Sequence, residues 1–305
     1  MPANRQPRTM DNPYYDWSPI STRAPLAWPG GARVAVCVIV SFEHLEWLPP
    51  AGAFVAPSSR RRRPYPAVTD IHETSYHDYG NRVGGFRVMR ALDRHGIKAT
   101  VAMDAGVAAG CPTLVQECRT RAWEFIGHGL ALSQMITERM SEAEERDHIE
   151  RSLAAVRHAS GQTPAGWIGM DYGESTRTVR LLAELGVRYV CDWPNDEQPY
   201  RMKVPRGQMV SLPVAVELDD VVTHTLRFIP IQRYATMIMD AFDRLYADGA
   251  TSGRLLVLNL HPTRIGQPFR IKYLEAALEH VMRRQGVWAA TGSEIVDWYL
   301  AHAPA

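Results

Sequence analysis

Ionisable side chains follow directly after an apolar run near the start of the chain. Residues 33–40 read RVAVCVIV, and Glu43, His44 and Glu46 come next, with Trp47 beside them. An unbroken β-branched run is typical of a strand that is buried on both faces of a parallel sheet. The sequence therefore predicts a buried strand that ends in a carboxylate and an imidazole.

Polar residues end other predicted strands in the same way. His128 follows residues 123–127, Asp192 lies at the end of 187–193, and His261 follows 254–260. In a parallel barrel the carboxyl ends of the strands open at one mouth. A carboxylate with two imidazoles suits hydrolysis, because one group takes a proton from water and another protonates the leaving nitrogen or supports the oxyanion. We expect Glu43, His128 and His261 to form a catalytic site.

Strand-like and helix-like segments alternate along the rest of the chain. The predicted strands are 33–40, 97–103, 123–127, 165–170, 187–193, 254–260 and 287–290, and the predicted helices are 82–96, 112–120, 141–160, 175–186, 231–249, 269–286 and 291–303. This alternation predicts an α/β fold, a single distorted (β/α) TIM-like barrel of about seven strands, and a closed barrel leaves no sheet edges. Residues 1–31 are rich in turn formers and are predicted to be an N-terminal arm on a barrel domain of residues 32–305.

Composition narrows the class of protein. The chain has 34 Lys and Arg residues and 33 Asp and Glu residues, so its net charge does not favour binding to nucleic acid or to an anionic membrane surface. A small-molecule substrate fits better. The four cysteines show no zinc-ribbon spacing, and no stretch resembles a secretory signal or a membrane span. We expect a cytoplasmic protein in which the Arg60–Arg63 run is a solvated loop.

Several longer motifs resemble a known superfamily. The sequence SFEH at residues 41–44, His128, AGWIGMDYGES at 165–175 and LNLHP at 258–262 resemble, in order, motifs of the polysaccharide deacetylase (NodB-homology) superfamily. YGNRVGGFR at 79–87, CDWPNDEQPY at 191–200, SLPVAVELDD at 211–220 and HPTRIGQPFRIKYL at 261–274 resemble its branch of metal-independent allantoinases and cyclic imide hydrolases. The resemblance runs from about residue 25 to the C-terminus.

The resemblance implies a role for each matching residue. Glu43 takes the position of the catalytic base, and His44 replaces an aspartate that binds metal in the family. His128 matches the first histidine of the family's His-x-x-x-His motif, but Leu132 stands at the second. His261 matches the family's late histidine, which acts as general acid or stabilises the oxyanion. The arginine of the family's Arg-x-Pro motif is absent near 166–169.

These departures bear on the cofactor. Sugar deacetylases of the superfamily usually hold a divalent metal with one Asp and two His, whereas only His44 and His128 remain here. Glu43 or Glu46 could supply a third ligand to zinc or a similar ion. Because Leu132 cannot bind metal, catalysis without a metal is favoured, and a site on His44 and His128 is the alternative.

Other residues are candidates for binding the substrate. Arg82 could hold a carbonyl or carboxylate, with a structural salt bridge as the alternative. Trp47 and Trp193 could form apolar pocket walls or simply pack. Asp219 and Asp220 could hydrogen-bond a histidine or a substrate N–H, or lie in an exposed turn. His72, His77 and His224 are predicted to lie in loops and to take no part.

The sequence thus predicts a hydrolase of carbon-nitrogen bonds other than peptide bonds. Its expected substrate is a small cyclic amide, imide or ureide, and its expected assembly is a homo-oligomer. One alternative is a metal-dependent N-deacetylase of an amino sugar or small acetamide. Another is a barrel without activity that binds a small ligand.

Overall fold

The structure is a computed structural model that describes residues 10–55 and 69–303. The Arg60–Arg63 run lies outside the described residues, so its predicted role as a solvated loop stays a prediction.

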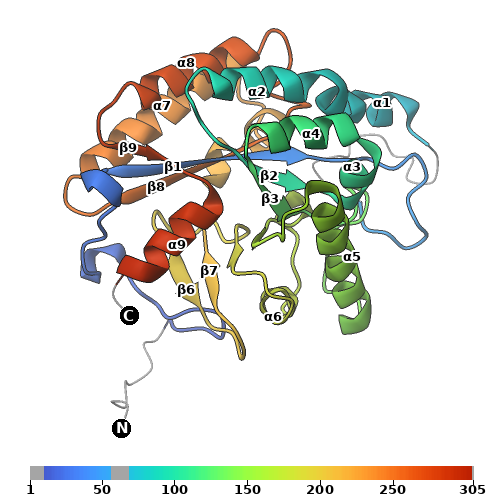
Figure 1. Cartoon of the computed structure of the whole chain (residues 1–305), viewed down its shortest axis with the longest axis horizontal. Coiled ribbons are helices and arrows are strands. Elements are labelled where there is room, and N and C mark those ends of the chain that lie inside the picture. Colours follow the sequence, from blue (N-terminus) through green and yellow to red (C-terminus); the bar gives the residue numbers. More distant parts are fainter. Residues whose placement is uncertain (1–9, 56–68, 304–305) are drawn as a thin grey trace.

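Strands and helices alternate over the described chain (Figure 1). The strands are β1 (Val34–Phe42), β2 (Thr100–Met103), β3 (Glu124–Gly127), β4 (Gly166–Trp167), β5 (Tyr189–Val190), β6 (Tyr200–Met202), β7 (Met209–Ser211), β8 (Arg254–Leu260) and β9 (Val287–Ala289). The α-helices are α1 (Ile71–Tyr79), α2 (Gly85–Asp93), α3 (Ala105–Gly110), α4 (Pro112–Thr120), α5 (Glu142–Ser160), α6 (Thr178–Glu184), α7 (Ile231–Asp248), α8 (Ile271–Met282) and α9 (Gly292–His302). Two π-helices, η4 (Gly80–Gly84) and η7 (Val222–Leu226), lie next to the site described below.

The strands form one curled, mostly parallel sheet. Its order is β6-β7-β5-β4-β3-β2-β1-β8, β9 also pairs with β1, and only the β6–β7 pair is antiparallel among the pairs of the described chain. This confirms the predicted distorted (β/α) barrel. Among the described strands β7 and β8 do not pair, and the gap is bridged instead by hydrogen bonds from Ala215 N to Val257 O (3.0 Å) and from Leu255 N to Glu197 O (2.9 Å).

The alternation of side chains along β1 separates two cores. Val34, Val36, Val38 and Val40 pack under α2, α7 and α8, which lie along one side of β1 in Figure 1. Ala35, Cys37 and Ile39 instead face the barrel interior, where they join side chains of β2, β3 and β8 and Ile295 and Val296 of α9. Because side chains alternate along a strand, the next interior positions on β1 are Ser41 and, just beyond it, Glu43.

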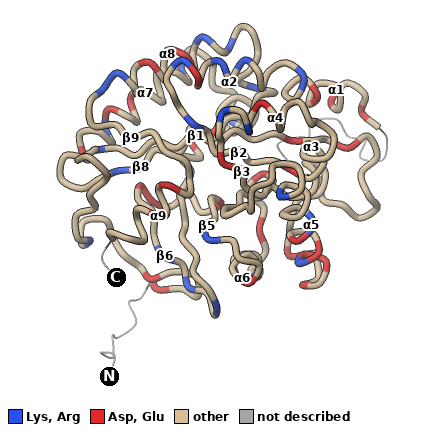
Figure 2. The backbone as a smooth tube through the Cα atoms, in the orientation of Figure 1, with Lys and Arg blue, Asp and Glu red and all other residues tan. Residues whose placement is uncertain are grey.

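Charged residues lie mainly on the outer helices. Figure 2 shows Lys, Arg, Asp and Glu along α5, α7 and α8, whereas β1 carries none and is buried along its whole length. The described helices include none with the length and apolar character that a membrane crossing requires.

Some elements differ from the sequence prediction. Residues 71–79 form α1, so His72 and His77 lie in a helix rather than a loop, and His224 lies in the π-helix η7. α3, β6 and β7 were also not predicted, because they are short and have little periodicity. Ser141 caps α5 with the capping box that its sequence predicts.

Glycines let η4 approach the segment that follows His261. A Cβ at Gly80 would collide with Thr263, one at Gly84 with the carbonyl oxygen of Pro262, and one at Gly266 with Gly84 itself. The backbone of η4 therefore rests directly on residues 262–266 and fixes the chain just beyond His261.

We predict that Gly84→Ala lowers the free energy of unfolding by about 1–3 kcal/mol, because its Cβ must displace the Pro262 carbonyl from a close-packed contact. Urea unfolding followed by circular dichroism measures the change. The matched control is Gly110→Ala in α3, where a Cβ would meet nothing within 4 Å. Equal stability of the two variants would show that η4 does not rest on residues 262–266.

Candidate active site

The site lies at the ends of β1, β3 and β8, where the side chains that face the barrel interior change from apolar to polar. On β8 the interior row runs from Leu255 and Val257 to Asn259 and then His261. Ser41 Oγ donates a hydrogen bond to Asn259 Oδ1 (2.8 Å), which joins the polar ends of the β1 and β8 rows. The same alternation that builds the apolar interior therefore brings Glu43 and His261 together at its end.

Glu43 lies between two imidazoles. Its Oε1 is 3.4 Å from Nε2 of His128 and 3.8 Å from Nε2 of His261. Burial by itself would raise the pKa of Glu43, but the charge of His261 and the hydrogen bond and charge of His128 outweigh it and lower that pKa to about 2. The Glu43 carboxylate is therefore ionised at neutral pH.

His128 is held from its other side. Its Nδ1 lies 2.6 Å from the backbone oxygen of Ile168, so Nδ1 carries the proton and donates to that oxygen. This contact fixes the ring with Nε2 directed at Glu43.

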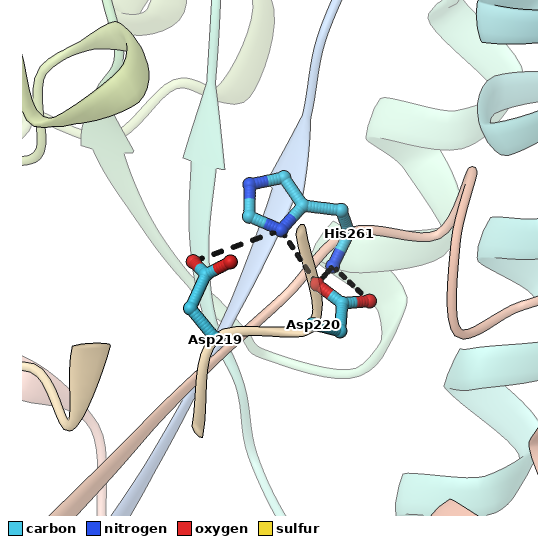
Figure 3. Close-up of side chains that lie close together, drawn as sticks. All are labelled: Asp219, Asp220 and His261. Atoms are coloured by element: carbon cyan, nitrogen blue, oxygen red, sulfur yellow. Dashed lines mark hydrogen bonds and ion pairs between the residues drawn. The ribbon is translucent and has the colours of Figure 1, made fainter. Parts of the chain in front are cut away.

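His261 is held by a buried pair of carboxyl groups (Figure 3). Its Nδ1 is 2.7 Å from Asp220 Oδ1 and 3.9 Å from Asp219 Oδ2. Burial lowers the pKa of His261, but Asp219, Glu43 and Asp220 together raise it to about 10. The imidazolium thus directs Nε2 toward Glu43 at neutral pH.

The carboxyl oxygens of Asp219 and Asp220 accept further hydrogen bonds. Asp220 also accepts from the backbone N–H groups of His261 (3.0 and 3.1 Å) and Ile265 (3.1 Å). Asp219 Oδ1 accepts from the N–H groups of Val221 and Val222, and its Oδ2 accepts from Tyr172 Oη (2.6 Å) and Asn259 Nδ2 (3.0 Å). The pair therefore acts as a rigid support for His261.

A cavity of about 10 Å³ lies against these groups, with room for about one water molecule. Its lining consists of Glu43, His128, Gly169, Asp171, Tyr172, Asp219, Val221, Val222, Asn259 and His261. An ionised carboxylate beside a water-sized cavity is the arrangement that a hydrolytic base requires.

The family's metal-binding positions do not form a fitting donor set here. Leu132 stands where the family has its second histidine, and it packs in an apolar cluster with Leu45 and Met170. The ring of His44 packs against Gly106 of α3, and His44 is not among the residues that line the cavity.

Asp219, Asp220 and His261 are the one cluster of possible metal ligands among the described residues. The atoms of this cluster that face one another already take part in hydrogen bonds with N–H and O–H donors. The hydrogens of these donors occupy the space that a cation would need. Neither this cluster nor the pair His44 and His128 fits a divalent ion, so no step below is assigned to one.

The structure places the remaining predicted residues apart from the cavity. Trp47 is exposed beyond the end of β1, and Arg82 is exposed on η4. Trp193 donates from Nε1 to Glu174 (3.0 Å), and its ring packs against the tilted ring of Tyr14 and the edge-on ring of Tyr15. Their predicted contacts with substrate stay predictions.

Several cavity residues were missed from sequence, among them Asn259 and Tyr172. Asn259 could have been found, because it stands two positions before His261 and thus on the same face of the strand. Tyr172 gave no signal, since its position depends on an irregular loop with positive φ at Asp171 (52°) and Tyr172 (59°).

Comparisons with known proteins agree with this fold. Residues 76–190 match the sequence family of polysaccharide deacetylases. A Schizosaccharomyces pombe protein, named as a candidate polysaccharide deacetylase, is 24% identical over 91% of this chain and 93% of its own length.

Solved structures of related proteins are similar to this chain over nearly its whole length. A probable polysaccharide deacetylase of Pseudomonas aeruginosa PAO1 is 26% identical, with a TM-score of 0.79 over 91% of this chain and 94% of its own. The Puue allantoinase is 25% identical, with a TM-score of 0.81 over 93% of this chain and 96% of its own. These similarities confirm the resemblance to the polysaccharide deacetylase superfamily that the motifs predict.

Proposed function

We propose that this protein hydrolyses a carbon-nitrogen bond in a small cyclic amide, imide or ureide and opens the ring. The observation that carries the proposal is the ionised Glu43, which lies between two histidines and lines a water-sized cavity with them. Leu132 at a metal-binding position supports chemistry that needs no metal ion. The similarity to an allantoinase over 93% of the chain supports a ring substrate.

Each residue has a role in the proposed reaction. Glu43 takes a proton from water as the water attacks the carbonyl carbon. His128, with Nδ1 held by Ile168, positions that water or the carbonyl through Nε2. His261 gives the proton on Nε2 to the leaving nitrogen when the ring carbon-nitrogen bond breaks, and Asp220 stabilises its charged form before that transfer.

Amide deacetylation is the second candidate, because the family match and the Pseudomonas aeruginosa structure concern polysaccharide deacetylases. The same base and acid would then release acetate from an N-acetyl group. The two reactions differ in their products. Ring opening adds one water to one molecule, whereas deacetylation splits the substrate into two.

We predict that the purified protein adds water to at least one of hydantoin, succinimide or allantoin, and that the rate is unchanged by a chelator. Mass spectrometry of the reaction mixtures detects the gain of one water. N-acetylglucosamine oligomers in the same panel test the second candidate. If acetate is released and a chelator stops the release, the proposed ring opening is wrong and the protein is a metal-dependent deacetylase.

We predict that Glu43→Gln lowers kcat by roughly 10³-fold, because the amide cannot accept the proton of water. The exposed Glu279→Gln on α8 removes a carboxylate far from the cavity and should keep full activity. Circular dichroism establishes that both variants stay folded. A Glu43→Gln protein with undiminished turnover would remove Glu43 from the mechanism.

The paired charges predict a wide pH plateau. With pKa values of about 2 for Glu43 and about 10 for His261, the carboxylate and the imidazolium coexist across neutral pH. Asp220→Asn removes a negative charge that favours the imidazolium, so the pKa of His261 must fall. We predict that the alkaline limb of kcat/KM moves about 1–3 pH units toward lower pH. An unmoved limb would show that His261 is not the acid.

A further inference from the structure

A second pair of carboxyl groups lies behind the cavity. The side chains of Asp192 and Glu174 lie close enough to interact, and two carboxyl groups can form a hydrogen bond only with a proton on one of them. Oε1 of Glu174 is buried, and no donor N–H or O–H of the described chain reaches it. A proton shared with Asp192 satisfies this otherwise unpaired oxygen.

Burial and the negative charge of Glu145 favour such a proton. Glu145 of α5 adds negative charge near Glu174, although Arg177 binds Glu145 at 3.1 Å. At Asp192, the hydrogen bond from the Gly169 N–H and the interaction with His128 act in the opposite direction and lower the pKa of Asp192. Burial is the largest cause that raises the pKa of Glu174 well above its usual range and that of Asp192 to about 7.

The pair also holds both ends of the loop at residues 169–173. Asp192 accepts the Gly169 N–H with both oxygens (2.8 and 3.0 Å), and Glu174 directly follows the loop and accepts from Trp193 Nε1. The ends approach so closely that a Cβ on Gly169 would collide with the carbonyl oxygen of Gly173.

The loop is strained, and its Tyr172 supports the surroundings of His261. Asp171 and Tyr172 are consecutive residues other than glycine with positive φ, a conformation that surrounding contacts must impose. Tyr172 then donates to Asp219 Oδ2 (2.6 Å), the oxygen that lies 3.9 Å from Nδ1 of His261. Release of the loop would therefore withdraw a support of His261.

We propose that Asp192 and Glu174 share one proton and are positioning residues, which hold residues 169–173 so that Tyr172 supports Asp219 and His261. The importance of this support for turnover rests on the proposed function. The shared proton itself does not, and it can be tested without a substrate.

The first experiment measures thermal unfolding against pH. A raised carboxyl pKa means that the folded state keeps a proton that the unfolded state releases, so stability falls as pH rises from the ordinary carboxyl pKa toward the raised pKa of the pair. In Glu174→Gln the amide N–H replaces the shared proton. Between pH 5 and pH 9 we expect the thermal unfolding midpoint to fall in both proteins. The fall should be larger by roughly 5 °C in the wild-type protein than in Glu174→Gln.

The control is Glu279→Gln, an exposed carboxylate whose loss should leave the wild-type curve unchanged. Parallel curves for wild-type protein and Glu174→Gln would overturn the shared proton.

The second experiment tests positioning with Asp192→Asn and Asp192→Ala. Asn can still accept from Gly169 and donate to Glu174, whereas Ala does neither. We expect Asn to keep the wild-type NMR signals of the His261 ring, and Ala to shift them. With a ring substrate from the panel above, we expect Ala to lower kcat about a hundredfold, as misplacement of a catalytic group does, and Asn to retain most of it.

An Asp192→Ala protein that is folded and has unchanged His261 signals would overturn the positioning role, whatever its activity. Unchanged signals in Asn and altered signals in Ala, together with no turnover by any variant, would support the role and refute the proposed function. If Asp192→Ala does not fold, Tyr172→Phe takes its place in the same comparison, because it removes the hydroxyl group that donates to Asp219 and accepts from Asn259.

Discussion

The buried contact between Asp220 and His261 is the interaction on which the site depends. Asp220 accepts the ring N–H of His261 and the backbone N–H groups of His261 and Ile265. A carboxylate with so many donors is held rigidly, and charge-assisted hydrogen bonds of this kind contribute about 1.5–3 kcal/mol each. The resulting imidazolium in turn stabilises ionised Glu43, so the two catalytic groups depend on each other for their charge.

This charged network lies at the end of the barrel interior, where the apolar side chains of the strands give way to polar ones. The interior rows of β1 and β8 are apolar from Ala35 and Leu255 as far as Ile39 and Val257, and they become polar only at Ser41 and Asn259. Burial penalises isolated charges, but each charged group here has a partner within hydrogen-bond or ion-pair distance. The glycines of η4 keep the segment after His261 in place from the outer side.

The residues at two of the family's metal-binding positions are not the ligands of its metal-dependent members. Leu132 extends an apolar cluster where a ligand would stand, and His44 packs on α3. The chain has instead a dense set of hydrogen bonds from Tyr172, Asn259 and the backbone to two carboxyl groups. In the proposed mechanism, this preorganised network polarises the reacting groups.

The sequence by itself determined the barrel and the strand ends that carry Glu43, His128 and His261, because alternating strands and helices and the period of buried strands are local patterns. It also predicted Asp219 and Asp220 as possible partners of a histidine, through the family motif. Only the tertiary structure showed that Asp220 pairs with His261, that Tyr172 reaches Asp219, and that Asp192 meets Glu174. These contacts join residues far apart in the chain or depend on a loop with unusual φ, and no local pattern encodes such distances.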